Sequence, residues 1–211
     1  MAAAAGERGD TRPVTAPSRP VRVLVLAGGG SRRLGHDKLA ATLGRGVTVL
    51  DALLAGVRDA LPFVQMSAVG PHRTTTQPVS WVREDPPGGG PVAGLAAGLV
   101  GLGDEDVVVV LAGDQPFVGP ALPMLLEALG EADAAIGVDP SGADQPLTGC
   151  YRVGPLRRAI GADPAGRSVR SLLTALTVVR VALSVQASLD IDTAADLARA
   201  RDLTQVRGRT T

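Results

Sequence analysis

The residues best suited to chemistry lie in a glycine-rich segment near the start of the chain. The segment LAGGGSRRLGHDK, residues 26–38, combines three consecutive glycines with the cations Arg33 and Lys38. Glycines let backbone N–H groups approach a phosphate closely, and cations neutralise its charge. Lys38 is the only lysine among the 21 basic residues, and a compact ammonium can follow a phosphate as it moves into a transition state. The segment is therefore either a phosphate-binding loop or an exposed turn with solvated charges.

Two familiar phosphate motifs do not fit this segment. A dinucleotide fingerprint, G-x-G-x-x-G, that begins at Gly28 would need glycine where Arg33 stands. A Walker A loop that uses Gly30 and Gly35 would need lysine where His36 stands. The missing third glycine disfavours a dinucleotide-dependent oxidoreductase.

Four aspartates could act together with such a loop. Asp114 follows a run of valines; it suits Mg²⁺, which prefers one or two carboxylates plus phosphate oxygens, and it equally suits a turn. Asp85 lies in a Gly/Pro-rich loop, where it either accepts a hydrogen bond from a base or ribose or is an ordinary turn carboxylate. Asp190 and Asp192 precede the last expected helix. Asp192 or Thr193 would cap that helix, and the alternative is a second carboxylate that faces the metal.

The remaining polar side chains give weaker signals. Arg167 and Arg170 lie three residues apart on one face of an expected helix, so they either bind a phosphorylated second substrate or form a solvated face. Cys150 is expected to fill a strand position and be inert, and Trp81 is expected in the core. A single cysteine excludes an internal disulfide, and two distant histidines disfavour a histidine metal site.

Alternating strands and helices must position these residues. The apolar and β-branched runs predict strands over residues 21–27, 63–69, 79–82, 106–112, 133–138, 145–152 and 178–185, and helical spacing predicts helices over 48–61, 91–101, 121–129, 167–176 and 193–202. The alternation predicts an α/β fold: one domain of three layers with a Rossmann-like, doubly wound, mostly parallel sheet. Such sheets bind ligands at the carboxyl ends of their strands, so we expect the glycine loop and Asp114 at one site.

Length and composition favour a soluble globular protein. The chain has 211 residues, 45% of them hydrophobic, and its 21 basic residues balance 21 acidic ones, which provides no net field to attract nucleic acid or an anionic membrane. The N-terminus does not resemble a secretory signal, and the longest apolar stretch, 91–103, is shorter than the about 20 residues that span a bilayer. We expect a disordered tail over 1–20, one domain over 21–205 and a frayed end over 206–211, in a cytoplasmic protein with no nucleic-acid or membrane partner.

Taken together, six sequence blocks resemble the molybdenum cofactor guanylyltransferase family, a branch of the nucleotidyltransferases. In order they are LAGGGSRRLGHDK (26–38), EDPPGGGPVAGLAAGL (84–99), VVVLAGDQPF (108–117), DQPLTGCY (144–151), GRSVRSLL (166–173) and DIDTAADL (190–197). The AGG spelling of the first block is similar to the guanylyl branch, whereas the cytidylyl branch more often reads AAG.

The resemblance implies a nucleotidyltransferase fold and a set of site residues. The implied nucleotide contacts are Leu26, Ala27, Gly28, Gly29, Gly30, Lys38, Ser67, Asp85 and Asp114. Ser67 stands where an asparagine is common in the family. Lys38, Arg33 and Asp114 would carry catalysis, and Asp114 and Asp192 would bind Mg²⁺ as the cofactor.

The implied reaction is transfer of GMP from GTP to Mo-molybdopterin, with release of pyrophosphate. A molybdoenzyme or a cofactor-insertion protein would be a further partner. Three alternatives stay open: a cytidylyltransferase for the same cofactor, a sugar- or alditol-phosphate nucleotidyltransferase, and a non-catalytic GTP-binding partner of a molybdoenzyme.

Overall fold

The computed structural model describes residues 20–28 and 37–207 of the chain. The main sheet contains β1 (Val21–Leu26), β4 (Gln65–Val69), β5 (Ser80–Val82), β6 (Val107–Ala112), β7 (Ala134–Val138), β8 (Asp144–Arg152) and β9 (Val178–Ala182). The helices are α1 (Val49–Ala60), α2 (Pro91–Gly98), α3 (Leu122–Leu129), α4 (Val153–Ile160) and α5 (Ala194–Arg207), with short 3₁₀ turns η1 (Gly119–Ala121) and η2 (Val169–Ala175). A separate two-stranded hairpin joins β2 (Thr42–Gly44) to β3 (Val47–Thr48).

The seven strands of the main sheet lie in the order β5-β4-β1-β6-β8-β7-β9. β5, β4, β1 and β6 run parallel, β8 runs antiparallel to both of its neighbours, and β7 pairs in parallel with β9. This arrangement confirms the predicted mostly parallel α/β sheet. The chain leaves β1 toward β4 and β5 and then crosses back to β6, so strand order reverses between β1 and β6. Ligands of such sheets bind at the carboxyl ends of the strands at this switch point.

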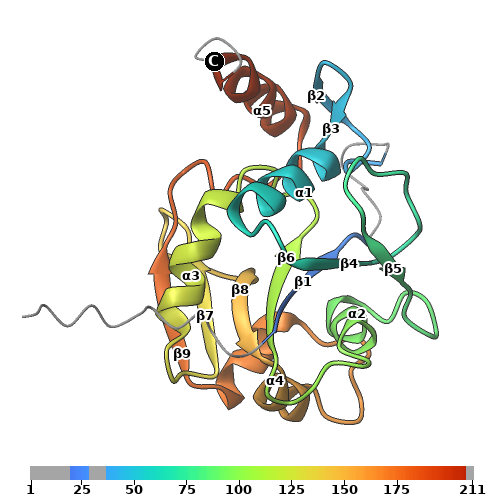
Figure 1. The fold of residues 1–211 in the computed structure, drawn as a ribbon, viewed down its shortest axis with the longest axis vertical. Coiled ribbons are helices and arrows are strands. Elements are labelled where there is room, and N and C mark those ends of the chain that lie inside the picture. The colour runs from blue at the N-terminus through green and yellow to red at the C-terminus, as the bar shows by residue number, and fades with distance from the viewer. Residues whose placement is uncertain (1–19, 29–36, 208–211) are drawn as a thin grey trace, which may run out of the picture.

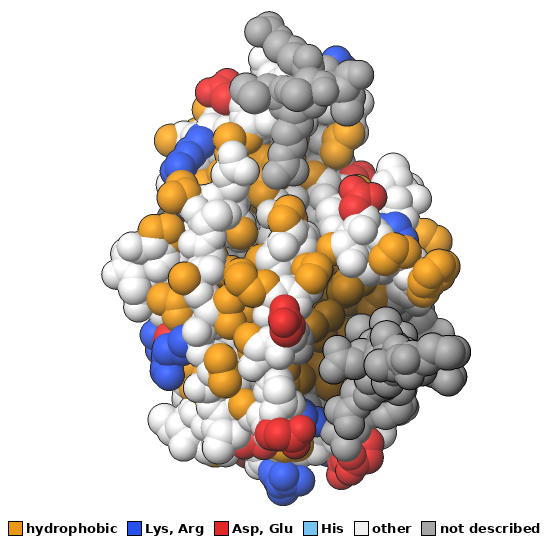
Figure 2. Space-filling view, turned by 60° about the vertical axis from the view of Figure 1, so that its left-hand side comes forward, with side chains coloured by type: hydrophobic (Ala, Val, Ile, Leu, Met, Phe, Trp, Pro, Cys, Tyr) orange, Lys and Arg blue, Asp and Glu red, His pale blue; other side chains and the backbone are white. Residues whose placement is uncertain are grey.

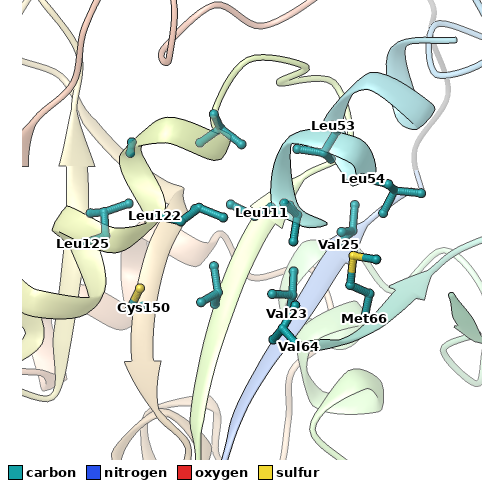
Figure 3. Packing of buried hydrophobic residues seen from close by; sticks show 14 of the residues in the cluster. Val23, Val25, Leu53, Leu54, Val64, Met66, Leu111, Leu122, Leu125 and Cys150 are labelled. Carbon is teal, nitrogen blue, oxygen red and sulfur yellow. The ribbon is translucent and has the colours of Figure 1, made fainter. Parts of the chain in front are cut away.

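Helices cover both faces of the sheet, which gives three layers (Figure 1). α1 and α3 pack on one face, while α2 and α4 pack on the other. Alternate residues of β1 serve the two cores: Val23 and Val25 belong to the α1/α3 side, and Leu24 belongs to the α2/α4 side. Figure 3 shows side chains of β1, α1 and α3 meeting in the first of these cores, among them Val23, Val25, Leu53, Leu54, Leu122 and Leu125. β6 is buried on both faces in the same way, which explains its nearly unbroken valine sequence.

A third apolar cluster attaches α5 to the β2–β3 hairpin. Leu197 and Ala200 of α5 pack with Leu43 of β2 and with Phe117, which lies in the connection after β6. α5 therefore stands beside the hairpin, away from the main sheet (Figure 1). This packing holds the segment before α5 against the end of β6, where the Ile191 N–H donates to the Asp114 carbonyl at 3.0 Å.

The structure differs from the predicted elements at several points, and the β2–β3 hairpin and η1 were not predicted at all. α4 was not predicted, because Gly154 and Pro155 in its first turn are poor helix formers. The predicted helix over 167–176 is a 3₁₀ segment, η2, in which Ser171 N–H bonds the Ser168 carbonyl three residues back. α5 continues to Arg207 instead of ending near residue 202. Residues 1–19 of the predicted tail and residues 208–211 lie outside the described residues.

One face of the molecule is largely apolar. Figure 2 shows the side toward which α3 and β9 lie; hydrophobic side chains occupy much of its middle, and most charged groups lie toward its edges. No helix in the described part of the chain is both long and apolar enough to cross a membrane.

Candidate functional site

A cleft of about 360 Å³ lies at the carboxyl ends of β1, β4 and β6. Leu26 and Val69, the last residues of β1 and β4, contribute apolar surface to its lining, and Leu147 contributes from β8. Gly113 N–H donates to the Leu26 carbonyl at 3.0 Å, which keeps the ends of β1 and β6 together. Gly28, the last described residue before the gap at residues 29–36, also lines the cleft. The cleft thus occupies the switch point at which this sheet topology binds ligands.

One cation predicted from the sequence, Lys38, meets two of the predicted carboxylates at this cleft. The Lys38 ammonium donates to Asp114 Oδ2, and it also donates to Asp192 Oδ1 at 2.8 Å. Burial opposes the charge of Lys38, but the hydrogen bonds to the two carboxylates outweigh this cost and raise the pKa of the ammonium. Asp114 and Asp192 lie 76 and 154 positions after Lys38 in the sequence, and the fold joins all three into one charged group.

Asp114 has one carboxylate oxygen that Lys38 does not use. Its Oδ1 is buried and has no hydrogen-bond partner in the described part of the chain, while the side chain as a whole is 15% exposed. A buried carboxylate oxygen without a partner is costly unless a cation or donor completes it. Asp114 and Asp192 fit a Mg²⁺ ion that takes its other ligands from phosphate oxygens and water. The described residues contain no group of three or more His, Cys, Asp or Glu side chains that could hold a metal by themselves.

The structure shows which residue caps α5. Thr193 caps the helix: its Oγ1 accepts from Asp196 N–H at 3.2 Å, and Asp196 Oδ2 accepts from Thr193 N–H at 2.8 Å. The hydrogen bonds from Thr193 lower the pKa of Asp196. Because Thr193 and Asp196 make the cap, the Asp192 side chain is left to face Lys38. Partial desolvation, together with the charges of Asp114 and Asp192, raises the pKa of the neighbouring Asp190.

The other predicted nucleotide contacts either lie outside the described residues or are absent from the described lining of the cleft. Gly29, Gly30 and Arg33 lie outside the described residues. Ala27 has a buried side chain, and its N–H donates to the Val69 carbonyl at 2.8 Å, so only its backbone is near the cleft. Ser67 lies inside β4, paired with Leu24 and Ser80.

Asp85 is exposed, and the residue before it, Glu84, is the one that lines the cleft in the described structure. Glu84 also accepts a hydrogen bond from Gly88 N–H at 3.1 Å. The sequence indicated Asp85 through its Gly/Pro-rich loop and through the family block, and it gave no separate signal for the adjacent Glu84.

The two arginines proposed for a second substrate bind the protein itself. Arg167 donates to the Ile160 and Ala159 carbonyls, and Arg170 donates to the Asp144 carbonyl at 2.8 Å. They connect η2 to α4 and β8. Cys150 is fully buried and its burial raises the pKa of the thiol, in keeping with the expected inert strand position. Trp81 is partly buried, with its ring 5.5 Å from that of His72.

Sequence reasoning missed an ion pair beside Lys38. Arg73, in the loop between β4 and β5, donates from Nε to Asp37 Oδ2 at 2.8 Å and from Nη1 to the Ala27 carbonyl at 2.8 Å. Partial burial opposes the charge of Asp37, but the hydrogen bond and charge of Arg73 lower the pKa of this carboxyl. No spacing rule connects residues 36 positions apart in two loops, so only the fold could reveal the pair.

Comparison with known proteins places this site in a family. Residues 23–181 match the family described as the MobA-like NTP transferase domain. A protein of Mycobacterium tuberculosis, named probable molybdenum cofactor guanylyltransferase, is 30% identical over 171 residues, which cover 78% of this chain and 85% of the relative.

Solved structures show the same fold. The molybdopterin-guanine dinucleotide biosynthesis protein A of Archaeoglobus fulgidus superposes with a TM-score of 0.65 at 26% identity, over 88% of this chain and 99% of that chain. The 2-C-methyl-D-erythritol 4-phosphate cytidylyltransferase of Thermus thermophilus gives a TM-score of 0.65 at 21% identity, with 88% and 99% covered, and this likeness concerns the fold alone. The family match over most of the chain carries the assignment: the protein is a nucleotidyltransferase and belongs to the MobA-like NTP transferase family.

Proposed function

We propose that the protein transfers GMP from GTP to Mo-molybdopterin and releases pyrophosphate. The relatives named as probable molybdenum cofactor guanylyltransferases support the choice of substrates. The observation that carries the proposal is the meeting of Lys38 with Asp114 and Asp192 in a cleft at the switch point of the sheet. Such a group of one cation and two carboxylates suits a triphosphate and its divalent ion.

The reaction requires two anions to approach each other. The terminal phosphate of the pterin attacks the α-phosphorus of GTP, the new P–O bond forms, and the bond to pyrophosphate breaks. Lys38 would bind the phosphates and stabilise the charge that accumulates on the leaving group, together with the predicted Arg33. The Gly28 N–H and the amides predicted to follow it would cradle the phosphates. Positioning and electrostatics account for most of the catalysis of such transfers, and no covalent nucleophile is needed.

Asp114 and Asp192 would hold Mg²⁺ in this scheme. Bound there, the ion would supply charge neutralisation and Lewis-acid polarisation of a phosphoryl oxygen. The residues' own contribution is to fix two carboxylates at the end of β6 and before α5. The unpartnered buried oxygen of Asp114 is the feature of the structure that supports this role.

A pyrophosphate-release assay tests the proposal. Purified protein with Mo-molybdopterin and Mg²⁺ is given GTP, CTP or UTP in parallel, and the dinucleotide product is identified by mass spectrometry. We expect release with GTP and loss of release on removal of the divalent ion. Preference for CTP would indicate a cytidylyltransferase, transfer to a sugar phosphate instead of the pterin would indicate a different acceptor, and GTP binding without any release would indicate a non-catalytic partner.

Variants of two aspartates sharpen the assay. Asp114→Asn removes the charge that binds the cation and should reduce turnover by at least roughly 100-fold, the size of effect found when one electrostatic contact to the transition state is lost. Asp163→Asn, a change in an exposed loop, serves as the matched control and should turn over like the unaltered protein. Near-normal turnover of Asp114→Asn would remove this residue from the mechanism.

A further inference from the structure

We propose that Arg73 is a positioning residue that fixes Lys38 in the cleft. It does so by fastening Asp37, the neighbour of Lys38, to the end of β1. The proposal rests on the function proposed above, and it adds a residue that neither the family motif nor the lining of the cleft identified.

The hydrogen bonds of Arg73 join Ala27 to Asp37, which precede and follow the gap at residues 29–36. Its Nη1 donates to the Ala27 carbonyl at 2.8 Å, directly before Gly28, and its Nε donates to Asp37 Oδ2 at 2.8 Å. Nη1 also donates to Pro71 in its own loop at 3.1 Å. One guanidinium thus links Ala27, at the end of β1, to Asp37, the first described residue after the gap at residues 29–36. A planar fork of donors suits this task because it holds several acceptors in a fixed geometry.

Asp37 transmits this restraint to Lys38. Its second oxygen, Oδ1, accepts from Leu39 N–H at 3.1 Å, so the carboxylate holds the backbone on the far side of Lys38 while Arg73 holds the carboxylate. The Leu39 carbonyl in turn accepts from Leu50 N–H at 3.1 Å, which anchors the segment to the start of α1. The Lys38 side chain therefore projects from a backbone that is fixed on both sides.

The charges argue against Arg73 as a direct phosphate ligand. Its side chain is only 17% exposed, and its charge is already paired with Asp37. Asp37 and Lys38 line the cleft, whereas Arg73 is absent from the described lining. Arg73 is therefore a residue that acts through its neighbours, and its loss should displace the ammonium rather than remove a contact to substrate.

Arg58 provides a matched control. It also donates to two backbone carbonyls, those of Pro62 at 2.6 Å and Val64 at 3.0 Å. These carbonyls precede β4, at the end of the sheet opposite the cleft. Arg58→Ala should therefore lower the free energy of unfolding, because two hydrogen bonds to backbone carbonyls are lost, and it should leave Lys38 in place.

The first test measures the position of Lys38 directly, with no substrate present. Lys38 is the only lysine of the chain, so an amine-reactive reagent followed by mass spectrometry reports on this one side chain. In Arg73→Ala and in Asp37→Asn we expect Lys38 to react several-fold faster than in the unaltered protein at the same pH, because its ammonium is no longer held against Asp114 and Asp192. The double variant should react no faster than the single ones, because both remove the same link. Arg58→Ala should leave the rate unchanged. Equal rates in all five proteins would overturn the proposal.

The second test measures GTP binding and pyrophosphate release on the same proteins. Arg73→Ala should lower kcat by roughly 10–100-fold, the cost of a misplaced group in the site, and should weaken GTP binding. Arg73→Lys keeps the charge but lacks the planar fork that holds two acceptors in a fixed geometry, so its kcat should lie between those of Arg73→Ala and the unaltered protein. If only stability changes in Arg73→Ala, as in Arg58→Ala, the residue is merely structural. If the unaltered protein releases no pyrophosphate, the proposed function fails, and the labelling rates still decide the role of Arg73.

Discussion

At the scale of single residues, Lys38 is the counter-ion of two carboxylates. It neutralises Asp114, which is mostly buried, and Asp192, which is about half exposed. A Mg²⁺ ion that arrives with a nucleotide would need the same carboxylates. The ammonium and the metal would therefore compete for at least one of these carboxylates. The affinity of the protein for a free divalent ion should then depend on whether Lys38 is present.

Replacement of Lys38 should make the fold dependent on divalent ions. In Lys38→Gln the two carboxylates lose their cation, and we expect the free energy of unfolding without metal to fall by about 2 kcal/mol, less than for a fully buried pair because water reaches both partners. Added Mg²⁺ should recover most of this loss, because a ligand that binds only the folded state stabilises it. Urea unfolding with and without Mg²⁺ measures both effects. An equal response to Mg²⁺ in the variant and in the unaltered protein would contradict this account.

The sequence predicted those site residues whose chemistry is local. Lys38 was distinctive as a lone lysine after glycines, and Asp114 as a carboxylate that closes a buried strand. Asp192 was ambiguous, because a cap and a metal ligand use the same residue type at the same place. The reciprocal bonds of Thr193 and Asp196 show that these two residues make the cap, and the role of Asp192 as a metal ligand stays a prediction. Long-range contacts between loops, such as that of Arg73, leave no periodic signal in a sequence.

At the scale of elements, one glycine lets the ends of β1 and β4 meet. Gly70, directly after β4, has φ +143°, and a Cβ built there would stand 2.7 Å from the Ala27 carbonyl carbon and oxygen. The backbone of Ala27 and Gly28 therefore lies closer to position 70 than a Cβ at that position would allow. This contact places Gly28 beside the cleft.

Gly70→Ala should be strongly destabilising. We expect a loss of about 3 kcal/mol in the free energy of unfolding, the sum of an unfavourable left-handed backbone and a clash with a neighbouring strand end. Gly142→Ala is the control: it has φ +86° and nothing within 4 Å of the added Cβ, so it carries the backbone cost alone, about 1–2 kcal/mol. Urea denaturation of both variants isolates the clash. Equal losses would show that the close approach of the two strands has no energetic consequence.

Element prediction succeeded where apolar patterning was uniform and failed where local residue types opposed the final structure. β1 and β6 are buried on both faces, so a continuous apolar run sufficed to identify them. α4 carries Val153, Leu156 and Ile160 on one buried side, but the glycine and proline between them suppressed the signal. Tertiary packing against the sheet forms this helix despite its weak propensity.

At the scale of the whole molecule, the fold brings three distant segments to one cleft. Gly28 follows β1, Asp114 follows β6, and Asp192 precedes α5, whose packing on the hairpin holds it beside Lys38. The sheet topology alone accounts for the first two. The position of Asp192 depends on the separate apolar cluster of α5 and the hairpin, so a substitution in α5 could displace Asp192 while the sheet stays intact.

The stability of the whole molecule should fall in acid. Six aspartates have a lowered pKa in the folded protein: Asp37, Asp51, Asp133, Asp139, Asp144 and Asp196. The largest effect is at Asp139, where the hydroxyl of Ser141 and the N–H of Ala143 lower the pKa from 3.8 to about 2. A carboxyl with a lowered folded pKa binds fewer protons when folded. Its contribution to stability is therefore present above the unfolded pKa and is lost as the pH falls through the folded pKa.

Urea unfolding between pH 6 and pH 2 tests this prediction. We expect the free energy of unfolding to be nearly constant down to about pH 4 and to decrease from there toward pH 2, because the unfolded chain then takes up protons that the folded aspartates resist. Asp139→Asn should make the decrease shallower, since the amide does not titrate, while Asp163→Asn in an exposed loop should leave the profile unchanged. A stability that stays level from pH 4 to pH 2, or a profile that Asp139→Asn does not alter, would show that these hydrogen-bonded carboxylates do not control the acid limit of the fold.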